Sequence, residues 1–361
     1  RIYLRSVKKQ IEIFREDNIP LFTTMEEKQQ EYGAISAKMS IEVDGKKMTM
    51  QKAALLLKST DRAKREEIYN KISSRRLQDE KVLDDLFDEL ISLRQKIAKN
   101  ADFDNYRDYM FAAMGRFDYT PKDCFNFHDA IAKEIVPIIN SFEQKRKNKL
   151  GNESYKPWDT AVDVDGLPPL KPFDGGTELT DLSIECFNRL RPYFGECLST
   201  MKAMKHLDLE SKNGKAPGGF MYPLYEIGVP FIYMNAVGSQ RDLVTMVHEG
   251  GHAVHSFLSR DLSLTEFKST PSEVAELASM AMELLSMDHW DVFYDDAADL
   301  KRAKLEQLEK ALETLPWVAS IDKFQHWIYT TEHTAKQRKE KWLSISDELG
   351  NQIIDWKGNE N

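Results

Sequence analysis

The sequence is poor in two features, and each shortage excludes a class of protein. No apolar run approaches the roughly 20 residues that a helix needs to cross a bilayer, and no signal-like segment is present. Only three cysteines occur, Cys124, Cys186 and Cys197, and their spacing matches no structural zinc pattern. Free thiols in a reducing compartment explain them best. We therefore expect a soluble, cytoplasmic protein that does not interact with membranes.

An excess of positive charge is also lacking. The chain has 50 Lys and Arg against 59 Asp and Glu, a formal net charge of −9. A surface of this sign repels nucleic acid and anionic lipid, so neither is expected as a partner. The one basic run, residues 145–149, suits the C-terminal end of a helix, where positive charge is favourable.

Helical periodicity dominates the chain. A long helix is predicted from Thr60 to Lys99 and another from Pro121 to Gly151. The first carries an apolar stripe made of Leu83, Leu86, Phe87, Leu90, Leu93 and Ile97. A hairpin is predicted at 39–50, around the Asp44-Gly45 turn. With 361 residues, the chain is long enough to form two lobes.

Two short runs rich in aromatic and β-branched residues interrupt the helical pattern. They cover residues 218–222 and 229–235, and glycines bound them. We predict a small β-ribbon, placed directly before the segment described next. An exposed strand edge there would allow an extended peptide to add by backbone hydrogen bonds. A purely structural ribbon that covers the following helix is the alternative.

The most informative segment is His248-Glu249-Gly250-Gly251-His252. Histidines four residues apart on a helix lie on one face, about one turn apart, where both imidazoles reach a single tetrahedral zinc ion. Glu249 lies roughly 100° around the helix, beside the metal, where a general base belongs. We predict the helix over Gln240–Arg260, opened by a capping box of Ser239 and Asp242.

Two interior glycines in that helix require a physical reason. Each costs about 1 kcal/mol relative to alanine in a helix interior. Gly250 and Gly251 therefore indicate close approach of a substrate or of a neighbouring helix.

A catalytic zinc site usually takes three protein ligands, and the residues alone leave the third one open. A second helix is predicted from Pro271 to about Trp290, and it carries Glu273 and Glu276, either of which fits. His255 lies seven residues from His248, about 10.5 Å of helix rise. We assign it to supporting or packing the ligands rather than to binding zinc.

Together these motifs resemble the zinc site of the thimet-oligopeptidase family, most closely its oligoendopeptidase F branch. The segments HEGGHAVHSF (248–257) and SEVAELASMAMEL (272–284) are similar to that site. Four further segments stand in the family's order: residues 117–121, 156–159, 215–219 and 355–356. The similarity therefore extends over nearly the whole chain.

The resemblance implies a function and a set of residues. It implies one Zn²⁺ per chain, bound by His248, His252 and Glu276, with Glu283 in support of the site. It further implies a mainly α, two-lobed, zincin-like peptidase that cleaves short peptides in a deep channel. The residues taken to bind substrate on this basis are Gly218, Gly219, Tyr222 and Tyr233.

The resemblance also implies an arrangement of domains. We predict an incomplete helical N-terminal lobe over 1–115 and a catalytic region over 116–361. Because family members continue beyond both ends of this sequence, we expect a truncated chain that lacks some groups stabilising the transition state. Two alternatives remain: a zinc-binding chain without activity, and a helical interaction protein whose histidines are structural.

Overall fold

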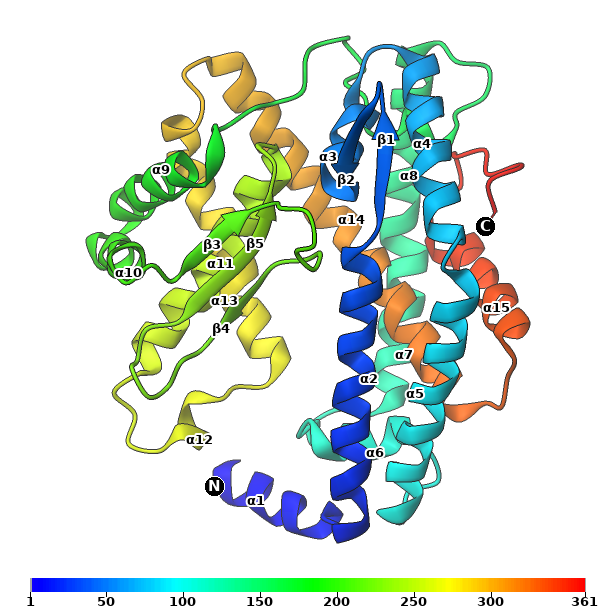
Figure 1. Cartoon of the computed structure of the whole chain (residues 1–361), viewed down its shortest axis with the longest axis vertical. Coiled ribbons are helices and arrows are strands. Elements are labelled where there is room, and N and C mark those ends of the chain that lie inside the picture. Colours follow the sequence, from blue (N-terminus) through cyan, green and yellow to red (C-terminus); the bar gives the residue numbers. More distant parts are fainter. Residues whose placement is uncertain (1, 361) are drawn as a thin grey trace. The chain divides into compact units, whose positions relative to one another are not determined.

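The computed structural model describes residues 2–360 and falls into two compact units (Figure 1). The helical unit comprises the chain up to Ile41, Leu56–Pro168, and the chain from Glu309 onward. The sheet unit comprises Glu42–Leu55 and Pro169–Leu308. The fold is mainly α with small sheets, as the sequence predicts. Both units are discontinuous in sequence, so their boundaries differ from the division predicted at residue 115. The predicted division into an N-terminal lobe and a catalytic region stays a prediction.

The helical unit is built from long helices. Its α-helices are α1 (Ile2–Ile13), α2 (Ile19–Ala37), α4 (Arg62–Leu77), α5 (Glu80–Asn100), α6 (Tyr106–Ala113), α7 (Pro121–Ala130), α8 (Val136–Leu150), the second part of α14 (Ala297–Thr330) and α15 (Ala335–Leu349). Short 3-10 turns lie at Glu16–Asn18, Leu56–Lys58 and Pro157–Asp159. One core of the unit forms where Leu86, Leu90 and Ile97 of α5 pack with Tyr106 and Ile328. The predicted stripe on α5 is therefore a core face.

The helix predicted from Thr60 to Lys99 is two helices. Asp79, between α4 and α5, has φ −102° and ψ 6°, outside the helical region, and its N–H donates to the carbonyl of Arg76. Its carboxylate pairs with Arg75 at 2.5 Å. Since the sequence has neither glycine nor proline there, nothing in the local pattern indicated the break.

The helix predicted from Pro121 to Gly151 begins and ends where expected, with Gly151 at φ 68° closing it. It is interrupted in the middle by a π-helical turn at Ile131–Ile135. Pro137 lies two residues after the end of that turn, and proline removes one main-chain donor and displaces the preceding turn of a helix. The long predicted element is thus α7, the π turn and α8.

A buried ion pair ties the irregular segment after α8 to α4. Asp159 is fully buried, and its carboxylate accepts hydrogen bonds from Arg65 Nη2 at 2.8 Å and from Arg62 Nη2 at 2.8 Å. Burial alone would raise the pKa of Asp159, but these guanidinium groups outweigh it and lower that pKa. Residues 152–176 are rich in proline, glycine and aspartate, which predicts a surface loop, yet this segment contributes to the interior of the helical unit.

The sheet unit surrounds a three-stranded sheet. Its elements are β1 (Ser40–Val43), which starts at the unit boundary, β2 (Lys46–Thr49), α3 (Met50–Leu55), α9 (Gly175–Leu190), α10 (Pro192–Ala203), β3 (Leu207–Glu210), β4 (Phe220–Tyr222), β5 (Phe231–Ala236), α11 (Gln240–Ser259), α12 (Thr265–Lys268), α13 (Ser272–Leu285), the 3-10 segment Ser286–Val292 and the start of α14. Strands β1 and β2 form the predicted hairpin.

The predicted ribbon is present as β4 and β5, which pair antiparallel with Met221 opposite Ile232. A third strand, β3, pairs parallel to β5 and was not predicted. The order β3-β5-β4 leaves β4 at an edge. Strand β5 is mostly buried, and its Ile232 and Met234 join a core with Leu243, Met246 and Val247 of α11. The sheet therefore positions α11.

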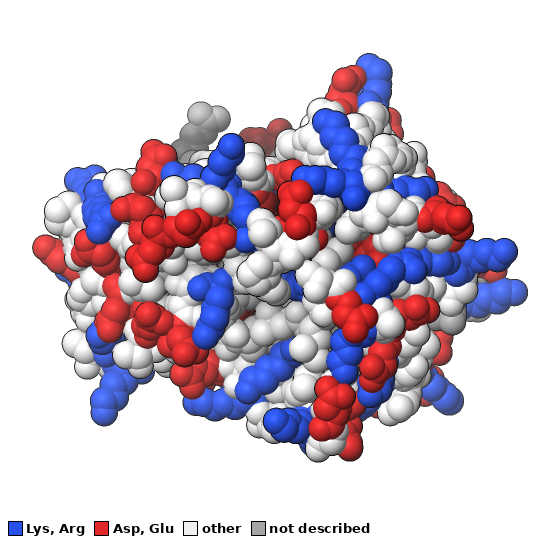
Figure 2. Space-filling view, turned by 90° about the horizontal axis from the view of Figure 1, so that it is seen from above, with Lys and Arg blue, Asp and Glu red and all other residues white. Residues whose placement is uncertain are grey.

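No helix among residues 2–360 has the length and apolar character that a bilayer crossing requires. Basic and acidic side chains are interspersed over the face shown in Figure 2, and neither sign forms a continuous field there.

The ion pair at Asp159 yields a stability prediction. Asp159→Asn removes the negative charge and leaves buried Arg65 uncompensated, so we expect the free energy of unfolding to fall by about 3 to 5 kcal/mol. Asp165→Asn, in the same segment but in an exposed pair with Lys149, should cost at most about 1 kcal/mol. Urea denaturation followed by circular dichroism measures both. Equal effects of the two variants would contradict the assignment.

The same carboxylate predicts a pH dependence. Because the pKa of Asp159 is lower in the folded chain than in the unfolded one, its contribution is present above the unfolded pKa of about 3.9 and is lost as pH falls through the folded pKa. The difference in urea midpoint between the wild-type chain and Asp159→Asn should therefore stay constant from pH 7 to about pH 5 and begin to shrink as pH falls through about 3.9 toward 3. A difference that stays constant down to pH 3 would show that the charge is not responsible.

Candidate metal centre and active site

The helix α11 begins where its capping box predicts. The N–H of Ser239 donates to Asp242 Oδ2 at 2.8 Å, and Ser239 Oγ accepts from the N–H of Asp242 at 3.3 Å. The helix runs over Gln240–Ser259, one residue short of the predicted end. It thus carries the five residues 248–252 in its buried middle.

Helix α13 packs directly on α11, and the two glycines explain how closely (Figure 1). A Cβ on Gly251 would lie 2.8 Å from the carbonyl oxygen of Ala278 and 2.8 Å from Cα of Ser279. A Cβ on Gly250 would lie 2.7 Å from the ring of Phe187 on α9. The predicted reason for the glycines, close approach of a neighbouring helix, is therefore correct.

This approach brings three metal-ligating side chains together. Ligand atoms of His248, His252 and Glu276 all lie within 4.8 Å of one another. His248 Nε2 is 3.3 Å from Glu276 Oε2, and His252 Nε2 is 3.7 Å from Glu276 Oε1. The two imidazole rings are 5.0 Å apart and nearly perpendicular. Two ring nitrogens and one carboxylate are a donor set that suits zinc.

Hydrogen bonds from residues outside the three-residue group orient His248 and Glu276. His248 Nδ1 donates to Glu283 Oε1 at 2.7 Å, so Nε2 is the nitrogen that faces Glu276. Gln307 Nε2 in turn donates to Glu283 Oε2 at 2.7 Å. Ser279 Oγ donates to Glu276 Oε2 at 2.8 Å. Neither Gln307 nor Ser279 was predicted, because no motif marks residues that act through another side chain.

The electrostatics of the two histidines differ. Burial lowers the pKa of both, and for His252 this effect prevails, so its pKa is lowered. For His248, the hydrogen bond to Glu283 and the charges of Glu249 and Glu276 outweigh burial and raise the pKa.

Glu249 lies beside the cluster and is 6% exposed. Burial raises the pKa of its carboxyl, against the opposing effects of His248 and of a hydrogen bond from the Met221 backbone. A carboxylate in such a site is a stronger base than one in water. It lies on α11, next to His248 in sequence, and receives its backbone hydrogen bond from Met221 of β4.

The other candidates lie outside this cluster. Glu273, the alternative third ligand, is exposed at the start of α13 and is not part of the three-residue group. His255 is half-buried one turn beyond His252 and lowers the pKa of that residue through its charge. Its predicted supporting role therefore rests on proximity to His252.

The predicted substrate residues lie on the ribbon and on the loop before it. Gly218, at φ 110°, lies in a loop whose carbonyls accept two hydrogen bonds from Asn235 Nδ2. A Cβ on Gly219 would lie 3.2 Å from Thr245 of α11. Tyr222 is 59% exposed on the edge strand β4. Tyr233 is half-buried, and its hydroxyl donates to the carbonyl of Ala216 at 2.7 Å.

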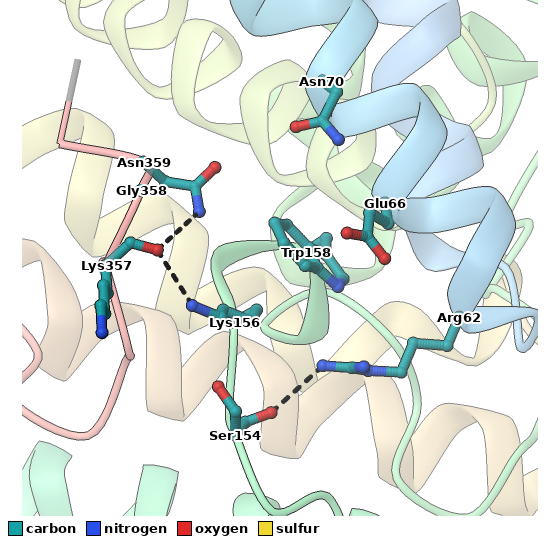
Figure 3. A pocket seen from close by; sticks show the side chains of 9 residues that line it. All are labelled: Arg62, Glu66, Asn70, Ser154, Lys156, Trp158, Lys357, Gly358 and Asn359. Atoms are coloured by element: carbon teal, nitrogen blue, oxygen red, sulfur yellow. Dashed lines mark hydrogen bonds between the residues drawn. The ribbon is translucent and has the colours of Figure 1, made fainter.

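A separate pocket of about 460 Å³ occurs in the helical unit (Figure 3). Arg62, Lys156 and Trp158 line it, together with Asn359. Its cations are already paired: Arg62 with Asp159, and Lys156 with Asp355 at 2.9 Å. It contains none of the predicted catalytic residues, and we assign no chemistry to it.

The contact at Gly251 predicts an asymmetric effect of alanine. Gly251→Ala places a methyl group against the backbone of α13, which has no rotamer to change, so we expect a net loss of about 1 to 3 kcal/mol in unfolding free energy. Gly250→Ala meets only the ring of Phe187 and should cost less. Urea denaturation of the two variants tests this order. A Gly251→Ala chain as stable as the wild type would exclude so close a packing of α11 and α13.

Comparison with known proteins agrees with this geometry. A model of peptidase family M3 matches residues 55–361. An oligoendopeptidase F homolog of Borreliella burgdorferi is 23% identical over 291 residues, which cover 80% of this chain and 48% of that protein. Oligopeptidase PepF of Bacillus subtilis is 24% identical over 56% of this chain and 30% of its own length. The chain thus spans about half or less of these relatives.

Solved structures show the same fold. PZ peptidase A, solved with an inhibitor, has a TM-score of 0.94 and 25% identity over 99% of this chain and 63% of its own. A candidate oligoendopeptidase F from Bacillus anthracis has a TM-score of 0.90 and 24% identity over 96% of this chain and 63% of its own. From the family match and these relatives, the chain belongs to peptidase family M3, in its oligoendopeptidase F branch.

Proposed function

We propose that this chain binds one Zn²⁺ ion at His248, His252 and Glu276 and hydrolyses short oligopeptides, with Glu249 as the general base. One observation carries the proposal: three ligand atoms converge within 4.8 Å, directly beside a buried carboxylate. When bound there, zinc would lower the pKa of water toward about 7 and polarise the scissile carbonyl. The family match supports a peptidase.

Glu249 performs the proton transfers in this mechanism. Its carboxylate takes the proton from the attacking water and delivers it to the leaving amine nitrogen. The raised pKa of Glu249 suits both steps, because a base whose pKa is nearer to neutral both accepts and returns a proton readily. The Met221 backbone hydrogen bond fixes the carboxyl without neutralising it.

The edge strand β4 is the proposed binding place for the peptide backbone. Within the described sheet, only one side of β4 is paired, and the strand contacts α11 beside Glu249. A peptide that adds to the free side would lie along the ribbon by backbone hydrogen bonds. Tyr222 is exposed on this strand and offers an aromatic surface to a side chain. Because Gly218 and Gly219 have no side chains, the adjacent loop would not obstruct the bound peptide.

The first experiment measures cleavage of a mixed set of quenched-fluorescence peptides, with and without a zinc chelator. We expect chelator-sensitive cleavage, and Glu249→Gln should lower kcat/KM about 100- to 10,000-fold with zinc content unchanged. Glu266→Gln, which alters an exposed acid on α12, is the matched control. Undiminished chelator-sensitive cleavage by Glu249→Gln would refute the assignment of the base.

Zinc retained without cleavage by the wild-type chain would favour the alternative of a metal-binding chain that lacks activity. Absence of bound zinc would favour a helical interaction protein. Zinc content per chain, measured by mass spectrometry of the metal, separates the three outcomes when it is combined with the cleavage assay.

The hydrogen bond between His248 and Glu283 gives a second prediction. Glu283→Gln weakens the acceptor that fixes Nδ1 of His248 and also disturbs the hydrogen bond from Gln307. We expect zinc affinity to fall about 10- to 100-fold. Competition with a chromophoric chelator measures this loss, and Asp291→Asn, in a surface pair with Arg189, is the control. Equal affinities of Glu283→Gln and the control would show that the link does not position His248.

A further inference from the structure

A second cluster of metal-ligating side chains lies in the helical unit. Cys124 and His128 are one turn apart on α7, and Asp322 and His326 are one turn apart on the second part of α14. Side chains four residues apart on a helix share a face, so each helix contributes a matched pair. None of these residues belongs to the cluster at His248.

The distances within the cluster are short. Cys124 Sγ, a carboxylate oxygen of Asp322 and a ring nitrogen of His326 all lie within 4.8 Å of one another. His128 Nε2 lies 2.7 Å from Asp322 Oδ2, so His128 donates to that carboxylate. His326 Nε2 lies 3.4 Å from the same oxygen. Ligands around a tetrahedral zinc ion are roughly 3.4 to 3.8 Å apart, so small rotations of the side chains close the site.

The imidazole of His326 is buried with its hydrogen-bonding capacity poorly satisfied. The residue is 5% exposed, its Nδ1 has no hydrogen-bond partner among the described residues, and its Nε2 has only the Asp322 carboxylate at 3.4 Å, outside good hydrogen-bond geometry. Phe125 packs against its ring at 4.9 Å and Phe111 at 5.9 Å, so the imidazole lies among apolar groups. Buried polar atoms without partners are costly, and native proteins contain few of them. A metal ion bound by one ring nitrogen would remove the cost at that atom.

We propose that Cys124, Asp322 and His326 form a second metal site, which takes a divalent transition ion of the zinc type. A sulfur, a nitrogen and a carboxylate oxygen form a donor set suited to zinc and unsuited to Mg²⁺ or Ca²⁺, which prefer oxygen alone. Cys124 binds as the thiolate and releases its proton to solvent. His128 is a positioning residue, which orients the Asp322 carboxylate by its hydrogen bond.

The ion would serve a structural purpose. It joins α7 to α14 within one unit, where Ile131 and Ala319 of the same neighbourhood already pack in one core. A metal that binds only the folded state stabilises that state in proportion to its occupancy. The proposal does not depend on the peptidase function, because the two sites share no residue and lie in different units.

Cobalt provides the test, because a thiolate bound to Co²⁺ absorbs in the near ultraviolet and imidazole or carboxylate ligands do not. Titration of the full chain with Co²⁺ should produce this absorption, saturating at about one equivalent of the ion bound through sulfur. Cys124→Ser should abolish it. Cys197→Ser is the matched control, because that thiol lies in the core of the sheet unit and should leave the absorption unchanged.

Two further variants keep the test decisive if Cys124→Ser folds poorly. His326→Gln removes a ligand and should abolish or greatly weaken the absorption, whereas His128→Gln should weaken cobalt binding about 10- to 100-fold and leave the absorption intact at saturation. No thiolate absorption in the folded wild-type chain, or one that persists in Cys124→Ser, would overturn the proposal. Neither the absorption nor the cobalt affinity depends on peptide cleavage. Failure of this proposal is therefore distinguishable from failure of the proposed peptidase function.

Discussion

The close approach of the α11 and α13 backbones is the constraint on which the site depends. Gly251 permits it, since any side chain there would meet the main chain of Ala278 and Ser279. The approach sets Glu276 opposite His248 and His252, and it allows Ser279 and Glu283 to reach the ligands from behind. The packing of these two helices thus determines where the three candidate ligands lie, and the side-chain conformations only adjust their positions.

Burial acts in opposite directions at the acids of this protein. At Asp159 two guanidinium groups outweigh the cost of burial and keep the carboxylate charged. At Glu249 the neighbouring groups only reduce that cost, so the pKa of the acid rises. The number of donors explains the contrast: Asp159 is surrounded by them, whereas Glu249, the base that we propose, has few.

The sequence predicted those parts of the site that repeat at helical spacing. Helix α11, its cap, the two histidines, the adjacent Glu249 and the small ribbon all follow from local patterns that the structure contains. The choice of Glu276 over Glu273 needed the family resemblance, because spacing alone permits both. The break at Asp79 and the strand β3 were not predicted, since no residue type at those places distinguishes them from helix and loop. His128 and Asp322 are 194 residues apart, so only the fold brings them together.

The ribbon beside α11 uses its own hydrogen-bond donors internally. The hydroxyl of Tyr233 and the amide of Asn235 both donate to the loop at 216–218, and Lys215 lies over the ring of Tyr233 at 4.3 Å while donating to carbonyls of β3. The loop is therefore ordered before any ligand arrives. The edge of the ribbon presents main-chain groups and the exposed side chain of Tyr222. If the peptide proposed above adds to β4, such a surface would select it by chain direction and by shape, and would tolerate many different side chains in it.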